Sequence, residues 1–172
     1  MMTHNDVLKS LRYTLKITDT KMAEIFRLGD GHISDDEVRS YLKNEGDDGY
    51  QECSHSDMSN FLNGLVIFKR GKDETRPPQP ALDRVTNNTV LKKVRVAFEL
   101  KDVDMVSIIE KSGLKVTKTE LSAFFRSPEH RNYRECQDQF LRQFLKGLVP
   151  APVPSATPDK VVSAKVRIAP VK

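Results

Sequence analysis

The stretch FLNGLV at residues 61–66 returns as FLKGLV at residues 144–149, and the two strings lie 83 positions apart. When the chain is compared with itself at this offset, Asn5–Val66 aligns with Asn88–Val149 without a gap, and 17 of the 62 aligned pairs are identical. Chance would give about 4 identical pairs, so similarity at one fixed offset indicates a tandem repeat. The sequence therefore predicts two copies of one structural unit.

Each copy is expected to fold into roughly four helices, because its apolar residues recur at helical spacing. No convincing alternation of apolar and polar residues, the pattern of a strand, appears before residue 150. The predicted fold class is all-α, a tandem duplication of a roughly four-helix repeat. The apolar residues that mark these helices lie within residues 7–15, 22–26, 38–42 and 58–66 of the first copy and within 90–98, 105–109, 121–125 and 141–149 of the second.

Polar residues mark where several of these helices begin. Asn5 and Asn88 are predicted N-caps of the first helices, because a short side-chain oxygen can accept a hydrogen bond from a free backbone N–H. The third helix of each copy is predicted to begin with a capping box, Ser34–Glu37 in the first copy and Thr117–Glu120 in the second.

Gly64 and Gly147 lie inside the fourth helices, where a glycine costs about 1 kcal/mol relative to alanine. Both copies keep the glycine beside the same apolar residues, so we expect each to lie at a close contact between two helices. The neighbouring apolar side chains should then form the core: Phe61, Leu62, Leu65, Phe144, Leu145 and Leu148.

The chain divides into four parts: a first helical repeat (1–70), a linker (71–87), a second helical repeat (88–149) and a basic tail (150–172). Arg76–Pro80 holds three prolines and cannot continue a helix. The tail is rich in proline and has no aromatic residue, so it is predicted to be disordered. Deletion of residues 151–172 should hardly change the melting temperature.

Composition excludes several classes of protein. No run approaches the ~18 apolar residues that span a bilayer, which argues against an integral membrane protein. Two cysteines in 172 residues do not make a disulfide scaffold and predict a cytoplasmic location. The net charge is +4, of which +3 belongs to the tail, so the repeats together are nearly neutral.

Four strings resemble a known family: NDVLKSLRYTLK (5–16), FLNGLVIFKRGKDE (61–74), NNTVLKKVRVAFELK (87–101) and NYRECQDQFLRQFLKGL (132–148). They look like the YehS-like family of uncharacterised bacterial proteins, whose members carry a domain of unknown function in two copies. The resemblance covers about residues 3–149. It implies an all-helical, cytoplasmic, bacterial protein and brings no reaction, cofactor or site residues.

Cys53 and Cys136 are the first candidates for chemistry, since a nucleophilic cysteine needs a nearby base. His55 is close to Cys53 in the sequence, but the position that matches His55 is Asp138. The two cysteines are therefore predicted to be small buried apolar groups. Two isolated cysteines and four scattered histidines also lack the spacing of a zinc site, so no metal and no cofactor is predicted.

The basic residues of the two first helices are the candidate binding residues. They would form a duplicated anion-binding stripe of Lys9, Arg12, Lys16, Lys92 and Arg95. The structural alternative is that Arg12 and Arg95 fix helix packing through ion pairs. Their predicted partners are Glu37 or Glu52 for the first arginine and Glu120 or Glu135 for the second.

Residues 18–43 could form a helix-turn-helix motif whose second helix would be the recognition helix for DNA. That helix would begin with Asp35, Asp36 and Glu37, three negative charges that repel phosphate. A helical hairpin that only packs against the rest of the domain is the favoured interpretation.

Three functional hypotheses remain. The leading one is a non-enzymatic interaction or regulatory module with a protein partner. The alternative is nucleic-acid binding through the basic first helices and the tail. An enzyme is the least favoured, because neither copy shows an acid/base or nucleophile constellation. The sequence leaves the partner and the oligomeric state open.

Overall fold

The computed structural model describes residues 2–149, and in this range it contains eight α-helices and no strand. Each helix of the second half begins 83 residues after its counterpart in the first half, which confirms the all-α, tandemly repeated fold. The tail predicted to be disordered, residues 150–172, lies outside the described residues. The helices are α1 His4–Leu15, α2 Asp19–Leu28, α3 Asp35–Leu42, α4 His55–Arg70, α5 Asn87–Ala97, α6 Asp102–Lys111, α7 Lys118–Ala123 and α8 Asp138–Leu148.

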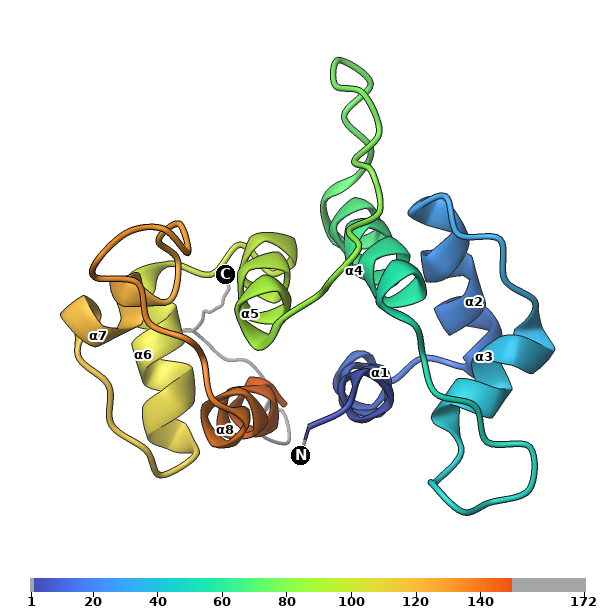
Figure 1. Ribbon diagram of the computed structural model, residues 1–172, viewed down its shortest axis with the longest axis horizontal. Helices are drawn as coiled ribbons and strands as arrows, with labels where there is room; N and C mark the ends of the chain where they lie inside the picture. The colour runs from blue at the N-terminus through green and yellow to red at the C-terminus, as the bar shows by residue number, and fades with distance from the viewer. Residues whose placement is uncertain (1, 150–172) are drawn as a thin grey trace, which may run out of the picture.

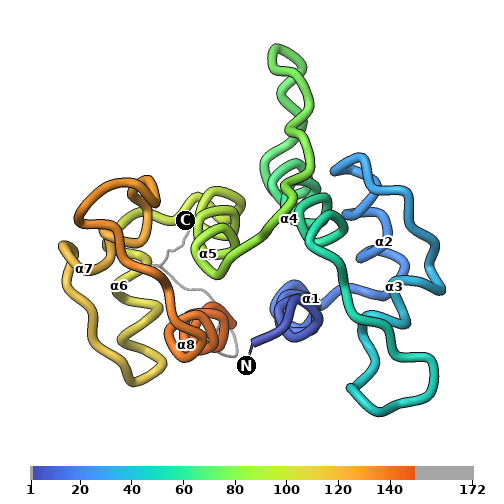
Figure 2. Tube along the Cα trace, viewed as in Figure 1, coloured from blue at the N-terminus to red at the C-terminus, as the bar shows by residue number. Residues whose placement is uncertain are grey.

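The two halves meet through their first and fourth helices. Helices α1, α4, α5 and α8 occupy the centre of the molecule, with α2 and α3 on one side and α6 and α7 on the other (Figure 1). Helix α4 packs on α5, and α1 packs on α8, so each first helix contacts the fourth helix of the other half. Between α4 and α5 the chain projects from the body and then returns (Figure 2).

The first helices begin at threonines and not at the predicted asparagines. Thr3 caps α1 and Thr86 caps α5, each accepting a hydrogen bond from a backbone N–H of the first turn. Asn5 and Asn88 lie two residues further along, inside the helices, and are buried. The N-cap prediction was wrong because a second good capping residue precedes each asparagine, and tertiary contacts claim the asparagine side chains.

Asn5 ties the segment before α4 to α1. Its amide nitrogen donates to the backbone oxygens of Tyr41 (3.0 Å) and Gln51 (2.8 Å), and its oxygen accepts from the N–H of Cys53 (3.0 Å). Asn88 makes the same three bonds in the second half, to Phe124, Arg134 and Cys136. One buried amide in each copy therefore satisfies three main-chain groups that could not reach water.

The glycines of the fourth helices lie at helix contacts, as predicted. A Cβ atom on Gly64 would stand 1.7 Å from the backbone oxygen of Ile25 in α2, and one on Gly147 would stand 2.2 Å from that of Ile108 in α6. In the first half Phe26 packs on Phe61, with ring centroids 5.1 Å apart. Five of the six predicted core residues are buried, and Leu148 is only partly buried at the end of α8.

Candidate functional site

Two of the five predicted binding residues are arginines that form matched ion pairs. Arg12 Nε lies 2.8 Å from Asp19, and an Arg95 guanidinium nitrogen lies 2.6 Å from Asp102. The predicted glutamate partners were therefore wrong, because the turn after each first helix brings the aspartate at the start of the second helix back to the arginine. Arg95 also donates to the backbone oxygen of Leu100 (3.1 Å) and lies over the Phe125 ring. Both arginines join the first two helices of their own half.

The three lysines of the predicted stripe do not converge on one point. Lys9 Nζ donates to the Asn44 side chain (3.1 Å). Lys16 ends α1 in the left-handed conformation and is exposed, and Lys92 is exposed on α5. Anion binding by this set stays a prediction.

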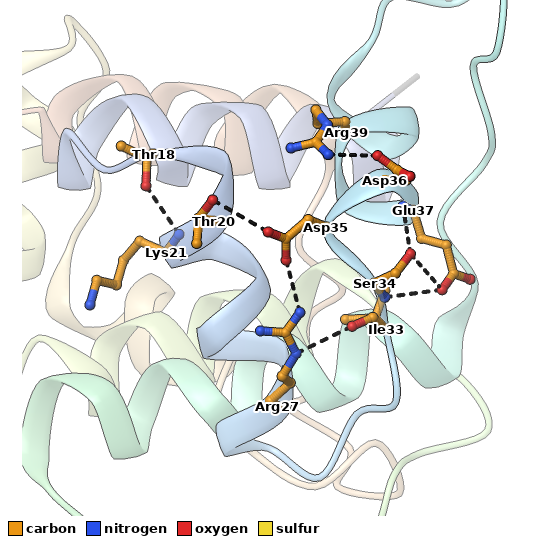
Figure 3. A network of polar contacts seen from close by, with 10 residues as sticks. All are labelled: Thr18, Thr20, Lys21, Arg27, Ile33, Ser34, Asp35, Asp36, Glu37 and Arg39. Carbon is orange, nitrogen blue, oxygen red and sulfur yellow. Dashed lines mark hydrogen bonds and ion pairs between the residues drawn. The ribbon is translucent and has the colours of Figure 1, made fainter.

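The acidic start of α3 is bonded within the α2–α3 hairpin (Figure 3). Asp35 accepts from Arg27 (2.8 Å), which lowers the pKa of Asp35, and Arg39 donates to Asp36 (2.6 Å). Glu37 completes the predicted capping box with Ser34, and Thr117 and Glu120 form the matching box in α7. These bonds favour the interpretation of a hairpin that packs.

Both cysteines are buried, as predicted. Burial raises the pKa of the Cys136 thiol to about 12 and raises the pKa of the Cys53 thiol still more strongly. A thiol needs to ionise to act as a nucleophile, so these two side chains are small apolar core groups. Their backbone N–H groups, bonded to Asn5 and Asn88, are what they contribute to the fold.

The halves enclose an open cleft of about 670 Å³ where α1, α4, α5 and α8 begin. The first residue of each of these four helices lines it. Among residues 2–149, no group of three or more histidine, cysteine or acidic side chains is arranged to hold a metal ion, here or elsewhere. The charged and imidazole side chains that line the cleft are His4, Glu52, His55, Arg84, Glu135 and Asp138, and the two cysteines, Cys53 and Cys136, line it as well.

On one side of the cleft, Asp138 joins α8 to the first residues of the chain. One carboxylate oxygen accepts from the N–H of Met2 (3.0 Å), and the other accepts from the side chain of Asn87 (2.8 Å). The bond from Asn87, and after it the bond from Met2, lowers the pKa of Asp138.

On the other side, His55 occupies the matching position and does the same with an imidazole. Its Nδ1 accepts from the N–H of Val85 (3.0 Å), the residue that matches Met2. His4, which matches Asn87, places its Nε2 3.0 Å from the same Nδ1. Burial, and then the charge of His55, lowers the pKa of His4. Each side of the cleft thus holds one backbone N–H bonded to the first residue of a fourth helix, from Met2 to Asp138 and from Val85 to His55. Beside each bond lies a side-chain pair within one half, His4 with His55 in the first and Asn87 with Asp138 in the second.

The linker returns along α4, where three polar side chains one turn apart hold it. We call His55, Ser59 and Asn63 the linker seat. Beyond the Val85–His55 bond, the N–H of Leu82 donates to Ser59 Oγ (2.9 Å), and Asn63 donates to the backbone oxygen of Gln79 (3.4 Å). Lys93 of α5 donates to Asn63 as well (2.8 Å), so the seat also joins the halves.

The matching positions on α8 are Asp138, Arg142 and Lys146, which we call the α8 stripe. Ser59 and Asn63 in the linker seat are 3% and 7% exposed, whereas Arg142 and Lys146 are both exposed. Within residues 2–149, no hydrogen bond or ion pair reaches the side chain of either cation. In the first half this helix face holds a segment of the chain. In the second half the matching face of α8 is exposed.

Neither the seat nor the stripe was predicted from the sequence. A signal was present: Asn63 interrupts the most similar stretch of the two copies, where the second copy has Lys146, and Ser59 stands four residues before it, opposite Arg142. Polar residues at positions i and i+4 of a helix share one face. The role of Ser59 and Asn63 could not be predicted from the sequence, because the path of the proline-rich linker follows no periodic pattern.

No helix between residues 2 and 149 is both long and apolar enough to cross a membrane.

Comparison with known proteins agrees with the duplicated architecture. The family model described as "Protein of unknown function (DUF1456)" matches twice, over residues 4–71 and 87–151. The chain is 43% identical over 147 residues to "Uncharacterized protein YehS" of Escherichia coli (strain K12), a match that covers 86% of this chain and 94% of the relative. No solved structure matches the chain. With both repeats matched and most of the relative covered, the chain belongs to the DUF1456 family, as its resemblance to YehS-like proteins implied.

Proposed function

We propose that this chain is a non-enzymatic interaction module and that the α8 stripe is its binding face for a partner protein. The observation that carries the proposal is the contrast between matched positions on α4 and α8. In the first half, Ser59 and Asn63 are buried beneath a chain segment. In the second half, Arg142 and Lys146 stand exposed at the same register.

The structural alternative is that these two cations are ordinary solvated surface groups. Two features favour a binding role. The cations lie four residues apart, so they share one face of α8. That face also borders the contact between the halves, because Asp138 at its start accepts a bond from the N–H of Met2 and α8 packs on α1. A partner bound there would touch the junction of the repeats and could change how they are held together.

Nucleic-acid binding through the first helices and the tail remains the alternative prediction. Two of its five residues in the helices, Arg12 and Arg95, already have carboxylate partners in their own half. A phosphate ligand would compete with those ion pairs. The experiment below separates this alternative from the proposal.

The test is affinity capture from native bacterial lysate with and without nuclease. The bait variant Arg142→Ser/Lys146→Asn copies the side chains of the linker seat onto α8. The control variant Lys115→Ser/Lys118→Asn removes the same charge from exposed positions before and at the start of α7. We expect the wild type and the control to retain the same proteins after nuclease treatment, and the α8 variant to lose them.

Melting temperatures of all three proteins are measured first, because a loss of capture counts only if the α8 variant is folded. If all three baits retain the same proteins, or if nuclease removes everything that the wild type captures, the proposal is wrong.

We also propose that the chain works in the cytoplasm of a bacterium. The Escherichia coli relative supports a bacterial origin, and two free, buried thiols suit a reducing compartment. Cell fractionation with an antibody against the chain tests the location.

A further inference from the structure

We infer that the α8 stripe binds a non-helical, acidic polypeptide segment that runs antiparallel to α8. This inference rests on the proposed function and adds the chemistry and the direction of the ligand. It is drawn from the first half of the molecule, where the occupant of the equivalent face is part of the chain itself.

The linker supplies the geometry. Its contacts at Gln79, Leu82 and Val85 follow one another at intervals of three residues and meet α4 in the reverse order. The segment therefore runs antiparallel to the helix. All three contacts use the linker backbone, so the face holds a chain through its main-chain N–H and C=O groups, whatever its sequence. A second segment of the same form can lie along α8, because all four helices of the two halves keep the same offset.

The side chains of the stripe determine which chemistry the occupant needs. Ser59 Oγ accepts a hydrogen bond from the linker, but arginine and lysine can only donate. At Lys146 a backbone oxygen suffices, as the oxygen of Gln79 does at Asn63. At Arg142 the occupant has to offer an acceptor where the linker offers an N–H, and a carboxylate matches the planar guanidinium best.

The N-terminal end of the stripe is already occupied. Both carboxylate oxygens of Asp138 accept bonds from within the chain, so the ligand segment ends before this residue. It therefore covers about two helical turns around Arg142 and Lys146. A segment this short binds through a few charge-assisted hydrogen bonds, which makes its affinity sensitive to salt.

Two other occupants fit less well. The tail of this chain, residues 150–172, begins close to the stripe in the sequence, but it carries a net charge of +3 and would be repelled by two cations. A nucleic acid would supply negative charge, but two cations make a small electrostatic footprint for a ligand that binds chiefly through many phosphates. Both are tested as competitors.

The experiment uses the full chain and two fluorescent peptides made from the linker, whose own sequence at residues 77–86 is PPQPALDRVT. The acidic probe has Leu82→Glu and Arg84→Glu in that sequence, and the second probe is unchanged. Anisotropy titrations should show that the wild-type chain binds the acidic probe at least about tenfold more tightly than the unchanged one. The variant Arg142→Ser/Lys146→Asn should lose this preference, and Lys115→Ser/Lys118→Asn should keep it.

Three outcomes would overturn the inference: equal binding of both probes, a preference that survives in the α8 variant, or displacement of the acidic probe by a tail peptide or a single-stranded oligonucleotide at equal concentration. These failures are distinguishable from failure of the proposed function. If the acidic probe does not bind but lysate capture still depends on Arg142 and Lys146, the stripe is a binding face with a different ligand.

Discussion

The two halves of this protein begin all four of their helices at the same offset, yet they use their fourth helices differently. Helix α4 runs from His55 to Arg70 and holds the linker against the body. Helix α8 ends at Leu148, and the matching face carries two exposed cations. The shared residues of the two copies therefore determine the arrangement of the helices. A few polar positions that differ between the copies determine what each fourth helix can bind.

A second difference concerns how closely the helices approach. In the first half Gly29 and Gly64 face one another across the contact between α2 and α4. In the second half the residue that matches Gly29 is Ser112, so only Gly147 allows close approach to α6. The contact between α2 and α4 is therefore closer than the one between α6 and α8, and the same substitution should cost more there.

The largest predicted effect tests that difference directly. Gly64→Ala places a methyl group 1.7 Å from the backbone oxygen of Ile25, and Gly147→Ala places one 2.2 Å from that of Ile108. Overpacking of this kind costs about 1–3 kcal/mol, and we expect Gly64→Ala at the upper end and Gly147→Ala below it. Urea unfolding measures both, with Ser107→Ala on the exposed face of α6 as the control. A rise in the unfolding midpoint for either glycine variant would contradict the helix contact at that position.

The next prediction concerns Asn5 and Asn88, which hold three main-chain groups each. Replacing either by alanine leaves those groups without their bonds, and we expect a loss of about 2–3 kcal/mol in the free energy of unfolding. Loss of an ordinary N-cap costs about 1 kcal/mol. Because the network is the same in both halves, the two variants should lose nearly equal amounts. A loss near the N-cap value in both would show that the tertiary bonds contribute little.

These asparagines also show how far the sequence could be read. The repeat, the helix content, the capping boxes and the glycine contacts could all be predicted, because each follows from local spacing or from a matched pair of positions. Asn5 was misassigned because asparagine suits an N-cap, and nothing local distinguishes it from Thr3, which is the actual cap. Only the approach of the segment before α4 decides between them.

The predicted partners of Arg12 and Arg95 were wrong for a related reason. Each copy offers three matched acidic residues to its arginine, and in the first copy these are Asp19, Glu37 and Glu52. The choice depends on the turn after the first helix, where Lys16 takes a left-handed conformation, as Glu99 does in the second copy. Lysine and glutamate do not signal that conformation, so the pair could not be chosen from the sequence. The binding role of the α8 stripe could not be predicted either, since it is inferred from the path of the linker along α4.

A smaller loss of stability is expected when Arg12 or Arg95 is replaced. These two residues occupy matched positions, so their losses can be compared directly. Arg12 makes an exposed ion pair, which is worth less than about 1 kcal/mol. Arg95 is less exposed and adds a backbone bond and the face of Phe125, so Arg95→Met should cost about 1–2 kcal/mol. Urea midpoints of Arg12→Met and Arg95→Met test the order. Equal losses would mean that the backbone bond and the aromatic contact together add nothing measurable.

The smallest predicted effect is a change in stability with pH that arises from one side of the cleft and not from the other. Val85 can only donate its N–H, so His55 Nδ1 is the acceptor of that bond, and His4 Nε2 lies 3.0 Å from the same nitrogen. The pKa of His4 is lowered by burial and by His55, although Glu52 opposes the shift. The other charged groups that line the cleft are Arg84, Glu135 and Asp138.

The sign follows from proton counting. A histidine has a pKa near 6.5 in the unfolded chain, and the folded value of His4 is lower. Below about pH 6.5 the unfolded state therefore binds more protons, and stability falls with falling pH until the folded pKa is passed. The Asn87–Asp138 side holds only a carboxylate whose pKa is lowered from 3.8, so its contribution is lost only at more acidic pH.

The double variant His4→Asn/His55→Asp gives the first side the residues of the second. We expect the urea midpoint of the wild type to fall between pH 7.5 and pH 5.5, and the midpoint of the variant to fall less. The exposed His32 and His130 are present in both proteins and cancel in the comparison. If the two midpoints shift equally, the histidine pair does not respond to pH, and the two sides of the cleft are equivalent in function as well as in position.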